Sequence, residues 1–392
     1  MTARVLSILL ACLLLAPVVL AQTAVPGDYT DVPEMPRGGG GERIQMLFDA
    51  INTGDEALAR RFYDEAFSES VKERFPLAAY IGFFEEFATT KSKIEFHSIR
   101  VYDPPRKDET IIIYRDPVME TWEAFGFRYA EGEKPGGPLA GFSVNRARTP
   151  SDVEPEGPLT QKAFVAEVWP FLDKLCGRDL FSGTVLIARG DSVLVAASCG
   201  EASKRFHAPN KMDTKFNLGS MNKMFTSVAI MQLVEKGVLS VDDPISMYVD
   251  ESWLPKEITD VVTIHHLLTH TSGLGSYLNE TFMEGSRLRW RELDDYKELV
   301  HGDTLAFEPG TDWSYSNTGM FMLGVVIESA TGENYFDHIR DNIYDPAGMG
   351  DTDCYDMDCP IENLAIGYWP NDECPGGWKN NYYEHVVRGG PA

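Results

Sequence analysis

The stretch FNLGSMNKMF, Phe216 to Phe225, places Ser220 and Lys223 three residues apart with few other polar groups around them. The chain then continues without proline to Gly237, which predicts a helix that begins near the serine. Residues i and i+3 of a helix share one face. The sequence therefore predicts a hydroxyl and an amine side by side on a first helical turn, where the unsatisfied N–H groups of the helix also point. Residues expected to face the core are Val228, Met231 and Val234.

This serine and lysine pair has a definite chemistry. A serine hydroxyl becomes a nucleophile when a base takes its proton, and a lysine amine shielded from water can take part in that transfer. The backbone N–H of Ser220 can also donate a hydrogen bond to an oxyanion. The alternative is a helix-capping serine beside a solvated surface lysine, because S-x-x-K alone is a pattern of low information.

A second polar element follows at residues 307–319, FEPGTDWSYSNTG. Tyr315 and Asn317 stand two residues apart in a loop, before a helix expected to begin near Thr318. Alternate residues of an extended segment point to one side, so the phenol and the carboxamide are expected to face one cavity. A phenolate stabilised by lysine can act as a general base, and an amide can hold a substrate carbonyl. A buried tyrosine and an N-cap asparagine are the alternative.

With three further motifs, these elements resemble the serine β-lactamase and penicillin-binding protein superfamily, nearest in style to its class C-like esterase and D-aminopeptidase branch. The further motifs are LSVDDPI at Leu239–Ile245, VTIHHLLTHTSGL at Val262–Leu274 and IYDPAGMGDT at Ile343–Thr352. The resemblance extends from about Phe164 to the end of the chain. It implies that Ser220 is the acylated nucleophile and Lys223 its proton-handling partner. It also implies that Tyr315 is the general base and that Asn317 binds substrate.

The resemblance implies a mixed α/β (α+β) fold for residues 161–392, a β-lactamase/transpeptidase-like antiparallel sheet with a helical subdomain. Two apolar runs around Arg189–Ser192 agree with it, because they have the pattern of a β-hairpin. The implied function is a serine acyl hydrolase whose substrate is a small ester, a D-amino peptide or a β-lactam. No G-x-S-x-G motif occurs, which excludes the nucleophile elbow of the α/β-hydrolases.

One element of the family pattern is missing. A strand with Lys-Thr-Gly or His-x-Gly, which supplies the far wall of the site and a second oxyanion donor, is expected well after the Tyr-x-Asn loop, yet the sequence ends in RGGPA at Ala392. We therefore interpret the chain as a C-terminally truncated fragment. Two alternatives to an active hydrolase stay open: an inactive fragment, and a non-catalytic protein that retains the cleft to bind peptides or esters.

Residues 41–145 are expected to form a small α+β accessory domain. Asp55 can cap its second helix, and strand-like runs follow at 94–102, 110–115 and 122–129. The residues that recur at helical spacing in the first helix are Ile44, Leu47, Phe48 and Ile51. His97 is interpreted as an ordinary strand residue. Two segments are rich in proline. We expect a flexible tether at residues 22–40 and an interdomain linker at residues 146–160.

The first 21 residues have the pattern of a signal peptide. Arg4 precedes an apolar run from Val5 to Leu20, and small residues predict cleavage after Ala21. A lipoprotein cleavage site before Cys12 is the less favoured alternative. Nothing later in the sequence approaches the run of about 20 apolar residues that a transmembrane helix needs. We therefore expect a secreted or periplasmic protein.

Charge, cysteines and histidines limit the partners. The chain has 35 Lys+Arg against 60 Asp+Glu, a formal charge of −25 that argues against a nucleic-acid partner. An oxidising compartment favours one disulfide among Cys354, Cys359 and Cys374. A metal site is the less favoured alternative for these cysteines, because their spacing matches no zinc pattern. The cluster His265, His266 and His270 is interpreted as a wall of the cleft rather than a metal face. No metal or cofactor is expected, and the oligomeric state is left open.

Overall fold

The computed structural model describes residues 28–381, except 75, 92, 107, 131, 132, 134, 154–156, 356–358 and 372. Its packing divides the chain into two compact units, Met1–Phe171 and Leu172–Ala392, which are described separately. The predicted signal peptide and its cleavage site after Ala21 lie outside the described residues.

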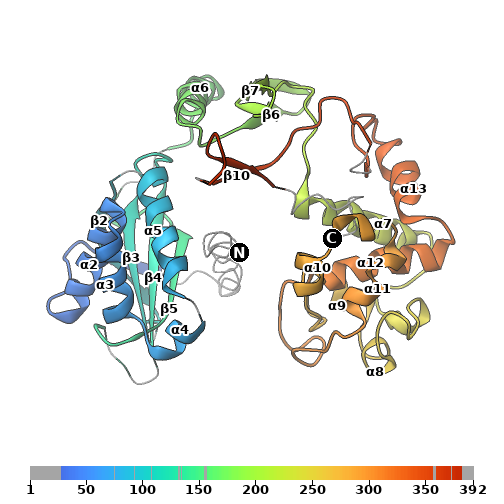
Figure 1. Ribbon diagram of the computed structural model, residues 1–392, viewed down its shortest axis with the longest axis horizontal. Coiled ribbons are helices and arrows are strands. Elements are labelled where there is room, and N and C mark those ends of the chain that lie inside the picture. The colour runs from blue at the N-terminus through green and yellow to red at the C-terminus, as the bar shows by residue number, and fades with distance from the viewer. Residues whose placement is uncertain are drawn as a thin grey trace. The chain divides into compact units, whose positions relative to one another are not determined.

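The first unit contains a five-stranded antiparallel sheet whose strands follow one another in sequence order (Figure 1). The predicted strands at 94–102, 110–115 and 122–129 are confirmed as β2, β3 and β4, and two strands were not predicted. The strands are β1 (Asp28–Val32), β2 (Glu95–Asp103), β3 (Glu109–Arg115), β4 (Trp122–Tyr129) and β5 (Leu139–Arg146).

Helices cover one face of this sheet (Figure 1). The predicted cap is confirmed, since the Asp55 carboxylate accepts hydrogen bonds from the backbone N–H groups of Ala57 and Leu58. Helix and sheet side chains then meet in an aromatic core that includes Phe62 and Phe125, both fully buried. The helices are α2 (Gly39–Thr53), α3 (Glu56–Ala66), α4 (Glu69–Arg74) and α5 (Leu77–Lys91).

The flexible tether predicted for residues 22–40 is wrong for its described part. Strand β1 pairs with β2, and the buried Asp31 carboxylate accepts two hydrogen bonds from the Arg100 guanidinium. The same carboxylate accepts the backbone N–H of Ser151, so the start of the predicted linker is also held on the sheet. The sequence did not reveal this strand. Its prolines suggested a tether, its buried residue Asp31 is charged, and Arg100, which binds Asp31, lies 69 residues away.

The second unit combines short antiparallel strand pairs with a larger helical part. The predicted hairpin around Arg189–Ser192 is confirmed as the pair β6–β7. The strands are β6 (Gly183–Arg189), β7 (Ser192–Cys199), β8 (Glu201–Ser203), β9 (Ala208–Pro209), β10 (Tyr368–Pro370) and β11 (Trp378–Asn380).

The helical part has its core around two helices, α7 (Lys223–Glu235) and α12 (Asn317–Thr331). The other α-helices are α6 (Gln161–Gly177), which continues from the first unit, α8 (Lys256–Thr259), α9 (Ile264–Leu268), α10 (Glu280–Glu284), α11 (Lys297–Val300) and α13 (Tyr335–Ile339). Short turns of other helix types are η2 (Gly219–Asn222), η3 (Ile245–Met247), η4 (Arg287–Arg289), η5 (Leu293–Tyr296) and η6 (Arg340–Tyr344). Within the described ranges, no helix combines the length and the apolar character needed to cross a membrane.

Of the three residues of α7 expected to face the core, Val234 packs against it and the other two do not. Val228 and Met231 are 42% and 48% exposed. The buried face instead carries Phe225, Ala229, Ile230 and Leu233. The helix is apolar almost all round, so its periodicity does not distinguish the inner side from the outer one.

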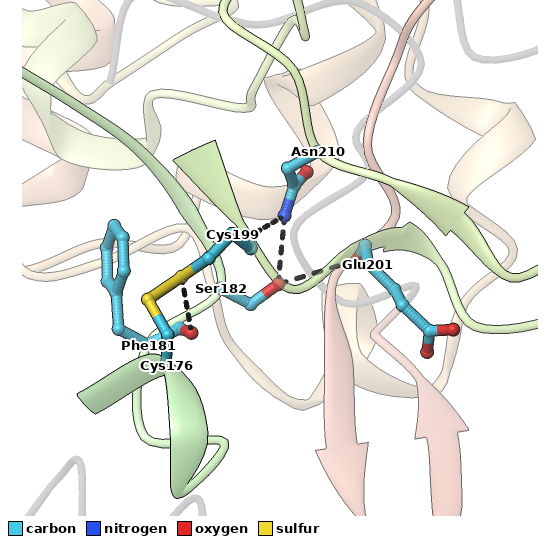
Figure 2. The surroundings of a disulfide bond; sticks show 6 residues. All are labelled: Cys176, Phe181, Ser182, Cys199, Glu201 and Asn210. Carbon is cyan, nitrogen blue, oxygen red and sulfur yellow. Dashed lines mark hydrogen bonds between the residues drawn. A yellow bond between two sulfur atoms is a disulfide. The ribbon is translucent and has the colours of Figure 1, made fainter. Parts of the chain in front are cut away.

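The expected disulfide among Cys354, Cys359 and Cys374 is also wrong, since all three remain thiols. Cys176 near the end of α6 is bonded instead to Cys199 at the end of β7, with the two Cα atoms 6.1 Å apart (Figure 2). Asn210 supports this corner by donating to the Cys199 carbonyl at 2.8 Å. Cysteine spacing alone does not determine connectivity, because the fold decides which side chains meet.

Candidate active site

The serine and lysine of the opening stretch lie side by side at the start of α7. Gly219 has φ 52°, a left-handed conformation that suits glycine, and turns the chain into the short helix η2. Ser220 lies in η2 and Lys223 begins α7, so the predicted first helical turn is a 3-10 turn. The Lys223 ammonium donates a hydrogen bond to Ser220 Oγ at 3.1 Å. Lys223 is only 8% exposed, whereas Ser220 is exposed.

Tyr315 reaches the same serine oxygen from the loop before α12. Its hydroxyl donates to Ser220 Oγ at 2.8 Å, and its ring centroid lies 5.0 Å from Lys223 Nζ. Ser316 is extended and caps α12 by accepting the backbone N–H of Gly319. Helix α12 begins one residue earlier than expected, at Asn317.

Asn317 is held by the loop that follows α9. Its amide donates to Ser276 Oγ at 3.1 Å. Gly275 in the same loop accepts hydrogen bonds through its carbonyl from the Ser316 hydroxyl and the Thr318 N–H. At Gly273 this loop lies against the backbone of Phe307. Its φ there is 80°, and a Cβ at this position would lie 2.7 Å from the Phe307 carbonyl oxygen.

Two of the three clustered histidines, His266 and His270, have different partners. His266 Nδ1 accepts the N–H of Thr263 at the start of α9. His270 comes after α9 has ended, with φ 58°, and its ring centroid lies 4.6 Å from that of Tyr315. The helical i, i+4 pairing of these two residues therefore does not form. Among the described residues, no group of three or more His, Cys, Asp or Glu side chains is arranged to hold a metal ion.

The site combines the exposed Ser220 hydroxyl and Tyr315 phenol with the buried Lys223 amine and the partly buried His270 ring. Burial lowers the pKa of His270, and the positive charge of Lys223 lowers it further. A neutral imidazole therefore stands beside Tyr315 at neutral pH. Ser220 Oγ has two proton-handling groups within hydrogen-bond distance, the geometry that activates a serine for attack on a carbonyl.

Sequence reasoning identified Ser220, Lys223 and Tyr315, and the structure brings these three side chains together at one oxygen atom. It did not identify the contacts of His270 with Tyr315 or of Ser276 with Asn317. The stretch HTSGLGS, residues 270–276, carried the available signal, because serine, threonine and glycine in a row are typical of a loop that binds other backbone groups.

Comparison with known proteins identifies a family. The sequence model of the Beta-lactamase family matches residues 172–385, more than half of the chain. The chain belongs to the beta-lactamase family. The match covers all the residues of the site described above.

Relatives within this family include penicillin-binding proteins and an esterase. A penicillin-binding protein of Bacillus subtilis is 38% identical over 193 residues, which cover 48% of this chain and 42% of that protein. Esterase EstB of Burkholderia gladioli is 33% identical over 207 residues, 49% of this chain and 51% of that protein. The chain thus spans about half the length of the curated relatives it matches.

A solved structure supports the fold. The crystal structure of a penicillin-binding protein from Bacillus halodurans aligns with a TM-score of 0.50 and 34% identity, over 60% of this chain and 67% of that one. The α+β fold of β-lactamase/transpeptidase type, with antiparallel strands and a helical part, is therefore confirmed.

Proposed function

We propose that this beta-lactamase family member is a secreted serine acyl hydrolase that forms an acyl-enzyme on Ser220. The observation that carries the proposal is the meeting of the Lys223 amine and the Tyr315 phenol at Ser220 Oγ. An exposed hydroxyl with two such neighbours is suited to nucleophilic attack, because one of them can take its proton while the other stabilises the resulting charge.

The proposed reaction has two steps. Tyr315, as a phenolate stabilised by the Lys223 ammonium, takes the Ser220 proton while Oγ bonds to the substrate carbonyl carbon. The Ser220 N–H stabilises the oxyanion, and the leaving group departs with the proton from Tyr315. Water then attacks the acyl carbon and gives its proton to the same base. Ser220 Oγ leaves the acyl group and regains its proton, which restores the enzyme. Asn317 is assigned to hold the substrate amide or ester.

The proposed substrates are small carboxylic esters, D-amino peptides and β-lactams. Relatives named as penicillin-binding proteins and as an esterase support this range, since all three substrate classes present a carbonyl group to a nucleophilic serine. Export, by a signal peptide ending at Ala21, is part of the proposal and rests on the sequence of the N-terminus alone.

A covalent probe tests the nucleophile. The full-length protein should be labelled by a fluorescent phosphonate, and peptide mass spectrometry should place the label on Ser220. Ser220→Ala should abolish labelling, whereas the matched control Ser227→Ala on α7, whose hydroxyl donates to the Lys223 carbonyl, should preserve it. Labelling that survives Ser220→Ala, or that is lost on adding a chelator, contradicts the proposal.

Substrate class is tested on the same protein with nitrocefin, a D-alanyl dipeptide and p-nitrophenyl acetate. Turnover of at least one, abolished by Ser220→Ala, supports a hydrolase. Binding of these compounds without acylation or turnover would favour instead the non-catalytic binding protein that the sequence left open.

A further inference from the structure

His270 contacts three consecutive residues of the loop that carries the phenol. Its carbonyl oxygen accepts the N–H of Ser314 at 3.0 Å, and its Nδ1 accepts the N–H of Ser316 at 3.2 Å. Between these two hydrogen bonds its ring lies against the ring of Tyr315, with centroids 4.6 Å apart and planes inclined by 35°. One residue thus holds both backbone neighbours of Tyr315 and the side chain itself.

The hydrogen bond to Ser316 requires a particular form of the imidazole. Nδ1 can accept a proton only when it carries none, so the ring is neutral with its hydrogen on Nε2. The ionisable groups facing the ring are Lys223 from α7 and Tyr315 from the loop, while Trp313 adds an aromatic contact at 5.8 Å. Across the described residues, His270 forms no ion pair with a carboxylate that would favour its charged form. Burial and the Lys223 charge both keep its pKa below the usual range.

The backbone of His270 also sets the design of a test. Its φ of 58° is left-handed, a conformation in which histidine, asparagine and glycine are better tolerated than most residues. Asparagine therefore fits the position, and its side-chain oxygen occupies roughly the place of Nδ1. Glutamine carries the same amide one methylene farther out, near the place of Nε2.

We propose that His270 is a positioning residue, whose neutral imidazole holds Tyr315 in contact with Ser220 by accepting the Ser316 N–H and packing against the phenol ring. This inference rests on the proposed acyl-enzyme function. Tyr315 Oη lies 2.8 Å from Ser220 Oγ, and displacing a reacting group by about an ångström can cost on the order of 10²-fold in rate. The hydrogen bond to the loop is therefore expected to affect acylation more than folding.

The kinetic test compares His270→Asn with His270→Gln in the full-length protein, by acylation rate with the fluorescent phosphonate and by thermal midpoint. The asparagine variant should keep the acylation rate within about threefold. The glutamine variant should stay folded at the assay temperature, with a thermal midpoint lowered at most by the cost of its left-handed φ, and should lose at least about tenfold in acylation rate. If His270→Gln does not fold, His270→Gly replaces it, because glycine suits the backbone and removes both contacts. Equal rates for the two amide variants, high or low, would overturn the proposal.

Nuclear magnetic resonance gives a second readout that does not depend on activity. With ¹⁵N-labelled histidine, His270 should show an unprotonated Nδ1 and a protonated Nε2 at pH 7. With ¹³C-labelled tyrosine, both variants lose the ring current of the imidazole, so the Tyr315 ring signal of His270→Gln is compared with that of His270→Asn and should differ from it. If the phosphonate labels no serine, the proposed function fails while these spectra still decide the positioning role. A hydrogen on Nδ1, or the same Tyr315 signal in the glutamine and asparagine variants, overturns it.

Discussion

Removing one oxygen atom, in Tyr315→Phe, separates the chemistry of the site from its packing. The phenylalanine ring keeps the 4.6 Å contact with His270 and the 5.0 Å contact with the Lys223 ammonium. Only the hydroxyl that lies 2.8 Å from Ser220 Oγ is lost. If that hydroxyl is the general base, acylation should fall by about 10²–10⁴-fold, the usual contribution of general acid–base catalysis. At about 1.4 kcal/mol per factor of ten, this is an increase of about 3–5 kcal/mol in the barrier.

The rate of phosphonate labelling and the burst of p-nitrophenol from p-nitrophenyl acetate both measure acylation. Folding is followed by thermal midpoint, which should hardly change because Tyr315 is 43% exposed and its hydroxyl can be replaced by water. Tyr248→Phe is the matched control. It also removes a hydroxyl, one that donates to Asp243 at 2.8 Å away from the serine, and should leave acylation unchanged.

Acylation by Tyr315→Phe within about threefold of the wild type would refute this reasoning. The base would then be Lys223, whose amine also contacts the serine oxygen. A large fall in both acylation and thermal midpoint would likewise refute it, since the phenol would then be a structural group of the loop.

Two further predictions concern stability. Lys91→Met leaves the buried carboxylates of Asp116 and Glu123 without their cation, so the free energy of unfolding in urea should fall by about 3 kcal/mol, the low end for a buried pair because Lys91 is 25% exposed. The control Lys72→Met removes a lysine that is 22% exposed but whose partner is exposed, so it should lose at most about 1 kcal/mol. Equal losses in the two variants would contradict this prediction. Asp303→Asn should raise the thermal midpoint at pH 7, because burial raises the pKa of this carboxyl and so disfavours its ionised form in the folded state. The gain should shrink as the pH falls and the native carboxyl takes up its proton; a gain independent of pH would count against this explanation.

Local sequence patterns predicted the elements of the fold that depend on neighbouring residues. The Asp55 cap, the hairpin around Arg189–Ser192 and the strands β2 to β4 all follow from side chains within a few positions of one another. Strand β1 did not, because its place in the sheet depends on the distant Arg100. The Cys176–Cys199 disulfide was not predicted for the same reason, since it depends on how α6 and β7 are packed.

In the candidate site, too, local patterns were predictable from the sequence and contacts between distant residues were not. Ser220 and Lys223 were predictable because helical spacing brings i and i+3 together. Tyr315 was assigned to the same site through its motif and the family resemblance, although 95 residues separate it from the serine. The contacts that hold its loop run from the Ser316 N–H to the His270 ring and from the Ser316 hydroxyl to the Gly275 carbonyl, so each involves a backbone group. A single sequence does not show which backbone N–H a ring nitrogen will meet.

The burial of Lys223 argues against a helix cap beside a solvated surface lysine. Ser220 Oγ is occupied by the lysine and tyrosine contacts, and Lys223 is 8% exposed rather than solvated. Within the described part of the chain, no carboxylate forms an ion pair with this ammonium. Burying an ammonium removes hydration from its charge, and a leucine or methionine would fill the same space without that cost. A fold that needed only packing at the start of α7 would be more stable with an apolar residue there. The lysine is therefore better explained by the proton chemistry of the serine beside it than by the stability of the helix.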